Sequence, residues 1–230
     1  MFMPLKDDTP LHIIRFQYVT LFIILLNVGI FLLTGPLAGE QALTLIETGF
    51  GVVPSELLDL ARVPNPEFNP VSEPVTLITY MFLHGGWLHL IGNMAFLWVF
   101  ADNIEDAFGP LLFGLFYLAC GVAAAVAHVL LNPNSHQPLV GASGAVSGVM
   151  AAYLLLYPKA RVWILLLMRI PIPVPAWVAL IGWIAWQGVS LLMPQQPGDV
   201  VAFWAHIGGF AAGLLITAIL RMRPFVQNRL

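Results

Sequence analysis

Charged residues in this chain are separated by stretches long enough to cross a lipid bilayer. Asp, Glu, Lys and Arg are absent from residues 16–39, 74–101, 107–158, 170–198 and 200–220. A transmembrane helix needs about 20 apolar residues, because the hydrocarbon core is about 30 Å thick and a helix rises about 1.5 Å per residue. These stretches predict a chain that folds within a membrane.

The composition excludes several other classes of protein. Hydrophobic residues make up 59% of the 230 residues and charged residues only 9%, against roughly 25% charged in a typical soluble domain. The net charge of −3 leaves no large basic surface, so we expect no nucleic-acid partner. The single cysteine, Cys120, indicates neither a disulfide framework nor a thiolate metal cluster.

The apolar stretches predict an all-α fold of six transmembrane helices. The stretch 107–158 is too long for one helix, and the turn-forming residues 132–138 divide it. The expected helices lie near 16–34, 87–103, 110–131, 142–157, 175–193 and 201–220. A tail at 1–15, a long connection at about 35–86 and a tail at 221–230 complete one domain, 16–220, with short ends.

Two segments allow more specific expectations. Residues 161–170 are expected to form an interfacial or short helical piece, because the prolines that follow at 171, 173 and 175 cannot continue a helix. The first apolar stretch is too long for a signal peptide and lacks a small-x-small cleavage site, so we expect it to stay as a helix.

The positive charges predict the orientation of the helices. With a cytosolic N-terminus, eight of the nine Lys and Arg residues fall on the cytosolic side, and only Arg62 falls outside. The eight are Lys6, Arg15, Lys159, Arg161, Arg169, Arg221, Arg223 and Arg229. We therefore expect both termini in the cytosol of an integral membrane protein, in a prokaryotic inner membrane, with the connection 35–86 on the exterior.

Polar residues enter three of the predicted helices from the exterior side. These are His89 and Asn93 in the second helix, Ser143 in the fourth and His206 in the sixth. At 1.5 Å rise per residue they lie within about two turns of one membrane depth. Each residue taken alone has a simpler explanation, in helix packing or in hydrogen bonds between helices. Their common depth favours a shared site.

This set of residues is suited to acyl transfer. His206 could remove the proton of Ser143, which would then act as a nucleophile. The Asn93 amide, the His89 ring and the backbone N–H of Ser143 could stabilise the negative charge that develops on a carbonyl oxygen. Asp199 lies about two turns from His206 along the sequence and is expected in a loop, so we expect a Ser-His dyad without a carboxylate.

The sequence from about residue 75 to 220 resembles the rhomboid family of intramembrane serine proteases. The resemblance rests on three motifs in the family's order: His84-x4-His89-x3-Asn93, Gly141-x-Ser143-Gly144 and Ala205-His206-x2-Gly209-x3-Gly213. It implies Ser143 as nucleophile, His206 as base, and His89, Asn93 and the Ser143 backbone as oxyanion site. It also implies an outward-opening cavity, gating by the fifth helix and a capping loop, and cleavage of transmembrane substrates without metal or cofactor.

The sequence departs from some members of the family at two places. Ser147 stands where an aromatic residue can stack on the catalytic histidine, so other contacts must orient His206. Val75 and Thr76 stand where Trp-Arg can precede the second helix. The conformation of this exterior loop is therefore not implied by the resemblance.

Other prominent residues have structural explanations. Gly144 and Gly148 are expected to pack closely against Gly209 and Gly213. The tryptophans of helices five and six are expected to face lipid or, as an alternative, to line the substrate entrance: Trp177, Trp183, Trp186 and Trp204. His84 could help to order the loop near the site or be a solvated interface residue. His128 and His136 lack the companions that a metal site needs.

Two other functions remain open. An inactive rhomboid-like protein that binds membrane clients would share the fold, but it would not need both Ser143 and His206. A channel or transporter would be expected to carry charged residues within the helices and a visible internal repeat. We therefore favour a protease whose partners are transmembrane substrates and the bilayer.

Overall fold

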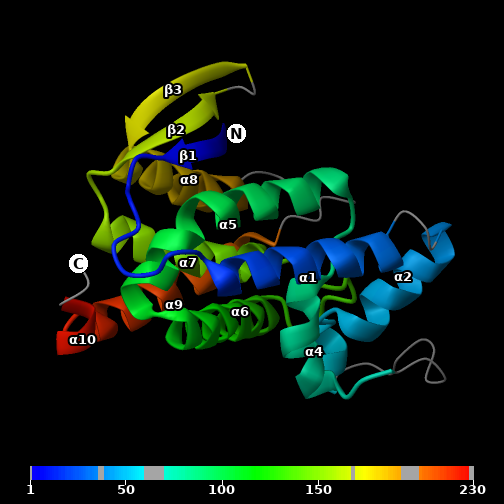
Figure 1. The fold of residues 1–230 in the computed structure, drawn as a ribbon. Helices are drawn as coiled ribbons and strands as arrows, with labels where there is room; N and C mark the ends of the chain where they lie inside the picture. Colours follow the sequence, from blue (N-terminus) through cyan, green and yellow to red (C-terminus); the bar gives the residue numbers. More distant parts are fainter. Residues whose placement is uncertain (1, 36–38, 60–69, 167–168, 193–201, 228–230) are drawn as a thin grey trace.

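The computed structural model describes residues 2–35, 39–59, 70–166, 169–192 and 202–227, and most of them are helical. Six apolar helices correspond to the six predicted ones (Figure 1). They are α1 (Tyr18–Thr34), α5 (Trp87–Phe108), α6 (Pro110–Leu131), α7 (Ser143–Leu156), α8 (Ala176–Leu191) and α9 (Phe203–Leu220). A short helix, α10 (Pro224–Gln227), follows α9. The residues Arg62, Asp199 and Arg229 lie outside the described parts of the chain.

Length and hydropathy support membrane crossing for some of these helices. Within the described residues, α6 and α9 are long and apolar enough to cross a membrane. A third candidate arises when α5 is joined across an 82° bend to the segment Glu73–Phe82. The helices α1, α7 and α8 are apolar but shorter. The count of six spans therefore stays a prediction.

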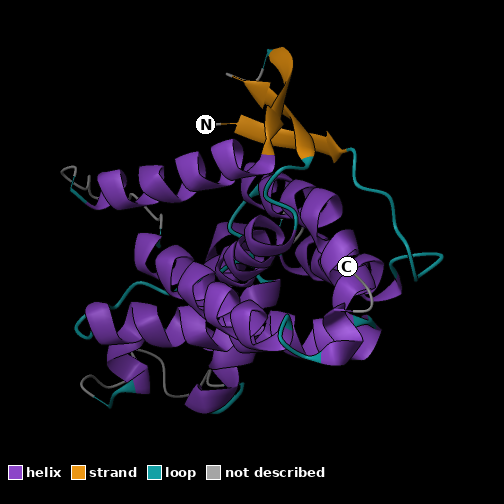
Figure 2. Ribbon diagram, turned by 90° about the vertical axis from the view of Figure 1, so that its left-hand side faces the viewer, coloured by secondary structure: helices purple, strands orange, loops and turns teal. Residues whose placement is uncertain are grey.

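The expectation of an all-α chain needs a correction, because three strands form an antiparallel sheet. The strands are β1 (Phe2–Asp7), β2 (Arg161–Leu166) and β3 (Ile170–Pro175), in the order β1-β2-β3. Figure 2 shows this sheet at one edge of the helices.

Within the segment 161–170, residues 161–166 form β2 and Ile170 begins β3, so the expectation of a short helical piece there was wrong. Its residues Val162, Trp163 and Ile164 are β-branched or aromatic, which favours a strand. The alternating prolines of β3 lack N–H groups, and this suits a strand at the edge of a sheet. The other edge of β2 pairs with β1, which belongs to the predicted N-terminal tail.

The long connection 35–86 contains short helices. They are α2 (Gly39–Phe50), α3 (Pro54–Leu57), α4 (Glu73–Thr79) and the 3-10 helix η1 (Tyr80–Phe82). A single β-bridge between Val52 and Leu139 joins this region to the connection before α7. In Figure 1, α2 and α4 lie at the end of the bundle opposite α10.

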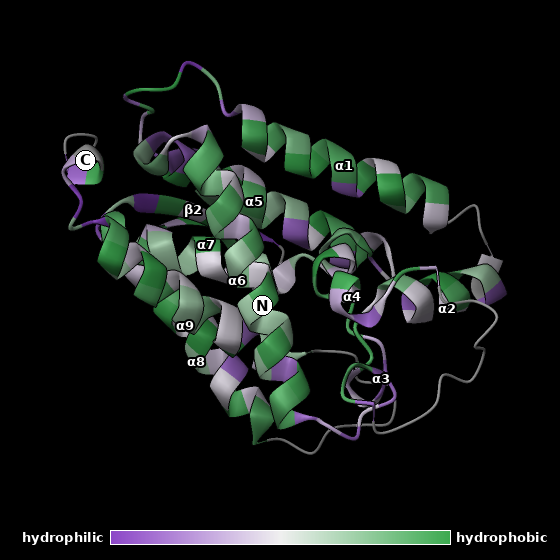
Figure 3. Ribbon diagram, turned by 90° about the horizontal axis from the view of Figure 1, so that it is seen from below, coloured by the Kyte–Doolittle hydropathy of each residue, from purple (hydrophilic) through white to green (hydrophobic). Residues whose placement is uncertain are grey.

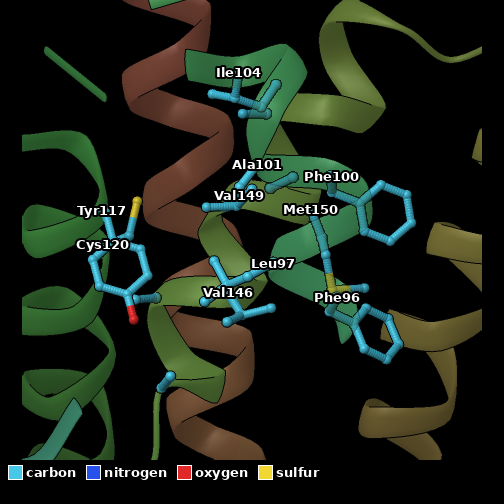
Figure 4. Packing of buried hydrophobic residues seen from close by; sticks show 14 of the residues in the cluster. Phe96, Leu97, Phe100, Ala101, Ile104, Tyr117, Cys120, Val146, Val149 and Met150 are labelled. Carbon is cyan, nitrogen blue, oxygen red and sulfur yellow. The ribbon is translucent and has the colours of Figure 1, made fainter. Parts of the chain in front are cut away.

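Helix α7 lies at the centre of the bundle and packs against α5, α6, α8 and α9. Its side chains Val146, Val149 and Met150 pack with Leu97 of α5 in the buried core (Figure 4). Apolar residues predominate along the helices, as the green segments of Figure 3 show, and several large apolar side chains of the peripheral helices are exposed. Leu111, for example, is 80% exposed. Such a surface suits contact with lipid.

Candidate active site

Ser143 and His206 lie in direct contact. Ser143 is the first residue of α7, and His206 lies in the first turn of α9. The Ser143 Oγ is 2.8 Å from the His206 Nε2, which is a hydrogen-bond distance. His206 is buried. The geometry is that of a nucleophile beside a general base.

Glycines allow the two helices that carry this pair to approach closely. A Cβ atom at Gly209 would overlap the backbone carbonyl of Gly144, and one at Gly213 would overlap the backbone of Gly148. A Cβ atom at Gly144 would in turn lie 2.5 Å from the Cβ of Ala124 on α6. The backbones of α7 and α9 are therefore nearly in contact, which brings Ser143 within reach of His206.

The second nitrogen of the His206 ring has a polar partner that the sequence analysis did not identify. The Oε1 atom of Gln187, on α8, lies 2.8 Å from His206 Nδ1. The ring of Trp183, one turn earlier, packs at 5.5 Å from the imidazole. One signal was present in the sequence: Gln187 is an amide within a charge-free apolar stretch, where polar side chains are costly.

Asn93 and His89 lie on one face of α5 at the same cavity. The Asn93 Nδ2 donates a hydrogen bond to His84 Nε2 at 3.0 Å. The ring of His84 packs edge-on against the ring of His89, with 5.0 Å between centroids. His84 is only 2% exposed. It is therefore not a solvated interface residue, and it orders the Asn93 side chain.

Gly141 is required at its position for two reasons. Its φ angle of +118° is one that residues with a side chain rarely adopt, and a Cβ atom there would lie 2.5 Å from the His89 Nε2. The backbone N–H of Gly141 donates to the carbonyl oxygen of Tyr80 at 2.9 Å. The chain thus turns sharply past His89 and starts α7 at Ser143. The N–H of Ser143 has no partner within the helix, because it belongs to the first turn.

The predicted site residues line one cavity of about 360 Å³. Its polar groups come from His89, Asn93, Ser143, His206 and Gln187. Its walls are mostly apolar, and Phe96, Val146 and Met150 of these walls are visible in Figure 4. Among the described residues, no group of three His, Cys, Asp or Glu side chains could hold a metal ion.

The structure also places the residues at which the sequence departs from some rhomboids. The hydroxyl of Ser147 donates to the backbone carbonyl of Ser143 at 2.6 Å, so this side chain is used within its own helix. Val75 and Thr76 lie in α4, and the Thr76 hydroxyl bonds to the carbonyl oxygen of Glu73.

The three tryptophans of α8 have different surroundings. Trp177 and Trp186 are about half exposed on the outside of the helix, at 49% and 55%. Trp183 instead lines the cavity.

Comparison with known proteins identifies the family. The Rhomboid domain model matches residues 71–223, which is about two thirds of the chain. The chain is 30% identical over 150 residues to "Rhomboid protein 1, mitochondrial" of Saccharomyces cerevisiae, covering 63% of this chain and 41% of that protein. It is 32% identical over 153 residues to "RHOMBOID-like protein 6, mitochondrial" of Arabidopsis thaliana, covering 66% and 46%.

A third relative matches a larger part of the chain. "RHOMBOID-like protein 4" of Arabidopsis thaliana is 31% identical over 196 residues, covering 82% of this chain and 42% of that protein. The chain thus spans less than half the length of these three relatives.

The chain belongs to the rhomboid family, and the predicted resemblance is confirmed. Members of this family are generally serine proteases that act within membranes, although some are inactive. The apolar helices agree with a membrane protein. The relatives compared are mitochondrial or plant proteins, so a prokaryotic inner membrane stays a prediction.

Proposed function

We propose that this chain is an intramembrane serine endopeptidase that cleaves transmembrane protein substrates with a Ser143–His206 dyad. The observation that carries the proposal is the 2.8 Å contact between Ser143 Oγ and His206 Nε2 inside an apolar cavity. A serine hydroxyl within hydrogen-bond reach of an imidazole is the arrangement that nucleophilic catalysis requires. Membership of the rhomboid family supports the same reaction.

The first step of the reaction is attack on the scissile peptide bond. His206 Nε2 accepts the proton of the Ser143 hydroxyl while Oγ bonds to the substrate carbonyl carbon. The carbonyl oxygen becomes negatively charged. Donors for this oxygen are the second N–H of the Asn93 amide, the His89 ring and the backbone N–H of Ser143, whose position at the start of α7 adds the positive end of the helix dipole.

The second half of the reaction returns the enzyme to its starting state. The His206 imidazolium gives its proton to the leaving amine, and the C–N bond breaks to leave an acyl-Ser143 ester. Water then attacks this ester while His206 Nε2 accepts one of its protons. The C–O bond to Ser143 breaks as the imidazolium gives that proton to Oγ, and the acid product leaves. Every proton in this cycle passes through Nε2 of His206, so the scheme requires no carboxylate.

We also propose where the reaction occurs in the membrane. Asn93, Ser143 and His206 each lie near the first residues of their helices, so the site lies close to one face of the bilayer. The positive charges that follow α9, Arg221 and Arg223, lie at the other end of that helix. By the positive-inside rule the site then opens toward the exterior, and substrates are cut near their exterior ends.

The test compares the wild type with Ser143→Ala and His206→Ala, purified in detergent or liposomes. A model transmembrane substrate is added and the products are identified by mass. We expect site-specific cleavage by the wild type and a loss of at least roughly 10³-fold in both variants. Equal thermal stability of the three proteins would exclude unfolding as the cause.

Two results would contradict the proposal. Cleavage that persists in Ser143→Ala would exclude this residue as the nucleophile. A wild type that cuts none of several substrates, and whose Ser143 is not labelled by a serine-directed phosphonate, would instead favour an inactive rhomboid that binds membrane clients.

A further inference from the structure

The His206 ring is held from the side opposite Ser143 by a buried amide. The Oε1 of Gln187 lies 2.8 Å from His206 Nδ1, and Gln187 is 6% exposed. This residue belongs to α8, whereas Ser143 and His206 belong to α7 and α9. A buried amide is costly unless it is hydrogen-bonded, and here its carbonyl oxygen is paired with the imidazole.

The two hydrogen bonds of the imidazole depend on each other. A neutral imidazole carries one proton, so one ring nitrogen donates and the other accepts. When Nδ1 carries the proton it donates to the Oε1 of Gln187, and Nε2 is left with a lone pair that faces the Ser143 hydroxyl. In the other tautomer, Nε2 carries the proton and cannot take one from Ser143.

We propose that Gln187 is a positioning residue that holds His206 in the tautomer able to accept the proton of Ser143. The inference rests on the proposed role of the Ser143–His206 pair. Gln187 is a neutral acceptor in the place where a Ser-His-Asp triad has a carboxylate. It therefore selects the tautomer and the ring orientation without placing a negative charge in the apolar part of the bundle.

The surroundings of His206 explain why α8 has this role. Ser147, four residues after Ser143, uses its hydroxyl within its own helix, where it donates to the Ser143 carbonyl. Trp183 and Gln187 are four residues apart and so share one face of α8. The Trp183 ring packs against the imidazole at an interplanar angle of 43°, and Gln187 bonds to the imidazole edge. One helix thus supplies both contacts that orient the base.

The experiment reads the tautomer directly by NMR of the full chain labelled with ¹⁵N-histidine in nanodiscs. The His206 ring signals are assigned as those lost in His206→Ala. In the wild type we expect a protonated Nδ1 and an unprotonated Nε2. Gln187→Met keeps the size of the side chain but removes the acceptor, so the ring should populate both tautomers.

The same variants are then assayed for cleavage of a transmembrane substrate. General base catalysis contributes roughly 10²–10⁴-fold, and we expect Gln187→Met to lose roughly 10- to 100-fold of kcat with little change in KM. Gly188→Ala is the control on the same helix. A Cβ atom there would meet nothing within 4 Å, so its ring signals and kcat should equal those of the wild type.

The outcomes separate this proposal from the proposed function. A wild-type ring protonated on Nε2 would overturn the positioning role, since the amide would then be donating to Nδ1. An unchanged tautomer in Gln187→Met would also overturn it, and so would a changed tautomer with unchanged kcat. The NMR measurement needs no substrate, so it decides whether Gln187 sets the tautomer even if Ser143→Ala shows that the dyad is not the protease site.

Discussion

The Asn93 amide can act as a preorganised donor, because it is held by a second residue. One N–H of its Nδ2 is donated to His84 Nε2, which leaves the other N–H available to the cavity. His84 is buried beside His89. Donors that are fixed before the reaction stabilise a developing oxyanion without any cost of reorganisation at that moment.

Asn93→Ala should therefore slow the chemical step. Loss of one oxyanion donor is expected to lower kcat by roughly 10²–10³-fold with little change in KM, and steady-state kinetics on a transmembrane substrate measure both. His84→Ala should have a smaller effect, because the Asn93 amide remains and only its orientation is loosened. Full activity of Asn93→Ala would show that this side chain does not contact the oxyanion.

At the scale of elements, the distance between α7 and α9 decides whether the two candidate catalytic residues meet. Gly213 and Gly148 face each other across this contact. The groups in the way of a Cβ atom at Gly213 are backbone atoms of α7, which cannot move aside as a flexible side chain would. Any side chain at this position must push the two helices apart.

Gly213→Ala is accordingly expected to cost about 1–3 kcal/mol of stability, as overpacking of a close contact does. It should also reduce the rate at which a phosphonate labels Ser143. Thermal unfolding in detergent and labelling kinetics measure the two effects. Gly29→Ala on α1 is the matched control, because a Cβ atom there meets nothing within 4 Å. An equal melting temperature for both variants would refute the close contact.

Glu105, near the C-terminal end of α5, accepts hydrogen bonds from the first turn of α1. The Glu105 carboxylate accepts hydrogen bonds from the backbone N–H groups of Val19 and Thr20, at 3.0 and 2.8 Å, and from the Thr20 hydroxyl at 2.8 Å. These N–H groups belong to the first turn of α1, where they have no partner within the helix. The carboxylate also lies at the positive end of the helix dipole.

Removing this carboxylate should loosen α1 from the bundle. Glu105→Ala leaves three donors without their acceptor, and we expect a loss of at least about 2 kcal/mol. Glu105→Gln keeps one acceptor oxygen and should lose less. We expect chemical or thermal unfolding in detergent to show that stability falls from the wild type to Glu105→Gln and again to Glu105→Ala. A different order would mean that hydrogen bonding by Glu105 does not stabilise the contact.

For the molecule as a whole, the directions of the helices determine at which end of the bundle its positive charges lie. α5, α7 and α9 all start near the cavity, and α1 starts where α5 ends. Lys6 before α1 and Arg223 after α9 therefore lie toward the end away from the cavity. Residues of α2, such as the exposed Gln41, lie toward the cavity end. By the positive-inside rule, this arrangement predicts that both termini lie in the cytosol.

Cysteine labelling tests this orientation. In intact cells a membrane-impermeant maleimide should label Gln41→Cys at once, but Lys6→Cys and Arg223→Cys only after permeabilisation. The unsubstituted chain is the control, because its one cysteine, Cys120, is buried and should not react. Labelling of all three variants from the same side would contradict the proposed topology.

The sequence predicted most helices well because each coincides with a long apolar segment bounded by charges or turn-forming residues. α5 is the exception, since it continues through Asp102, Glu105 and Asp106 to Phe108, past the predicted end at 103. The predicted segment 110–131 coincides with α6, and 142–157 differs from α7 by one residue at each end. The sheet was missed for a physical reason. The strand β2 pairs with β1 across more than 150 positions of the chain, and no local pattern reports a partner so distant.

The same distinction applies to the site. The motif spacings around His89, Asn93, Ser143 and His206 were enough to predict which residues share the cavity, because helical periodicity and a common depth can be read along the chain. Gln187 and His84 could not be assigned in this way. Each is a single polar residue whose role depends on which side chain from another helix packs beside it, and that is set by how the helices come together in three dimensions.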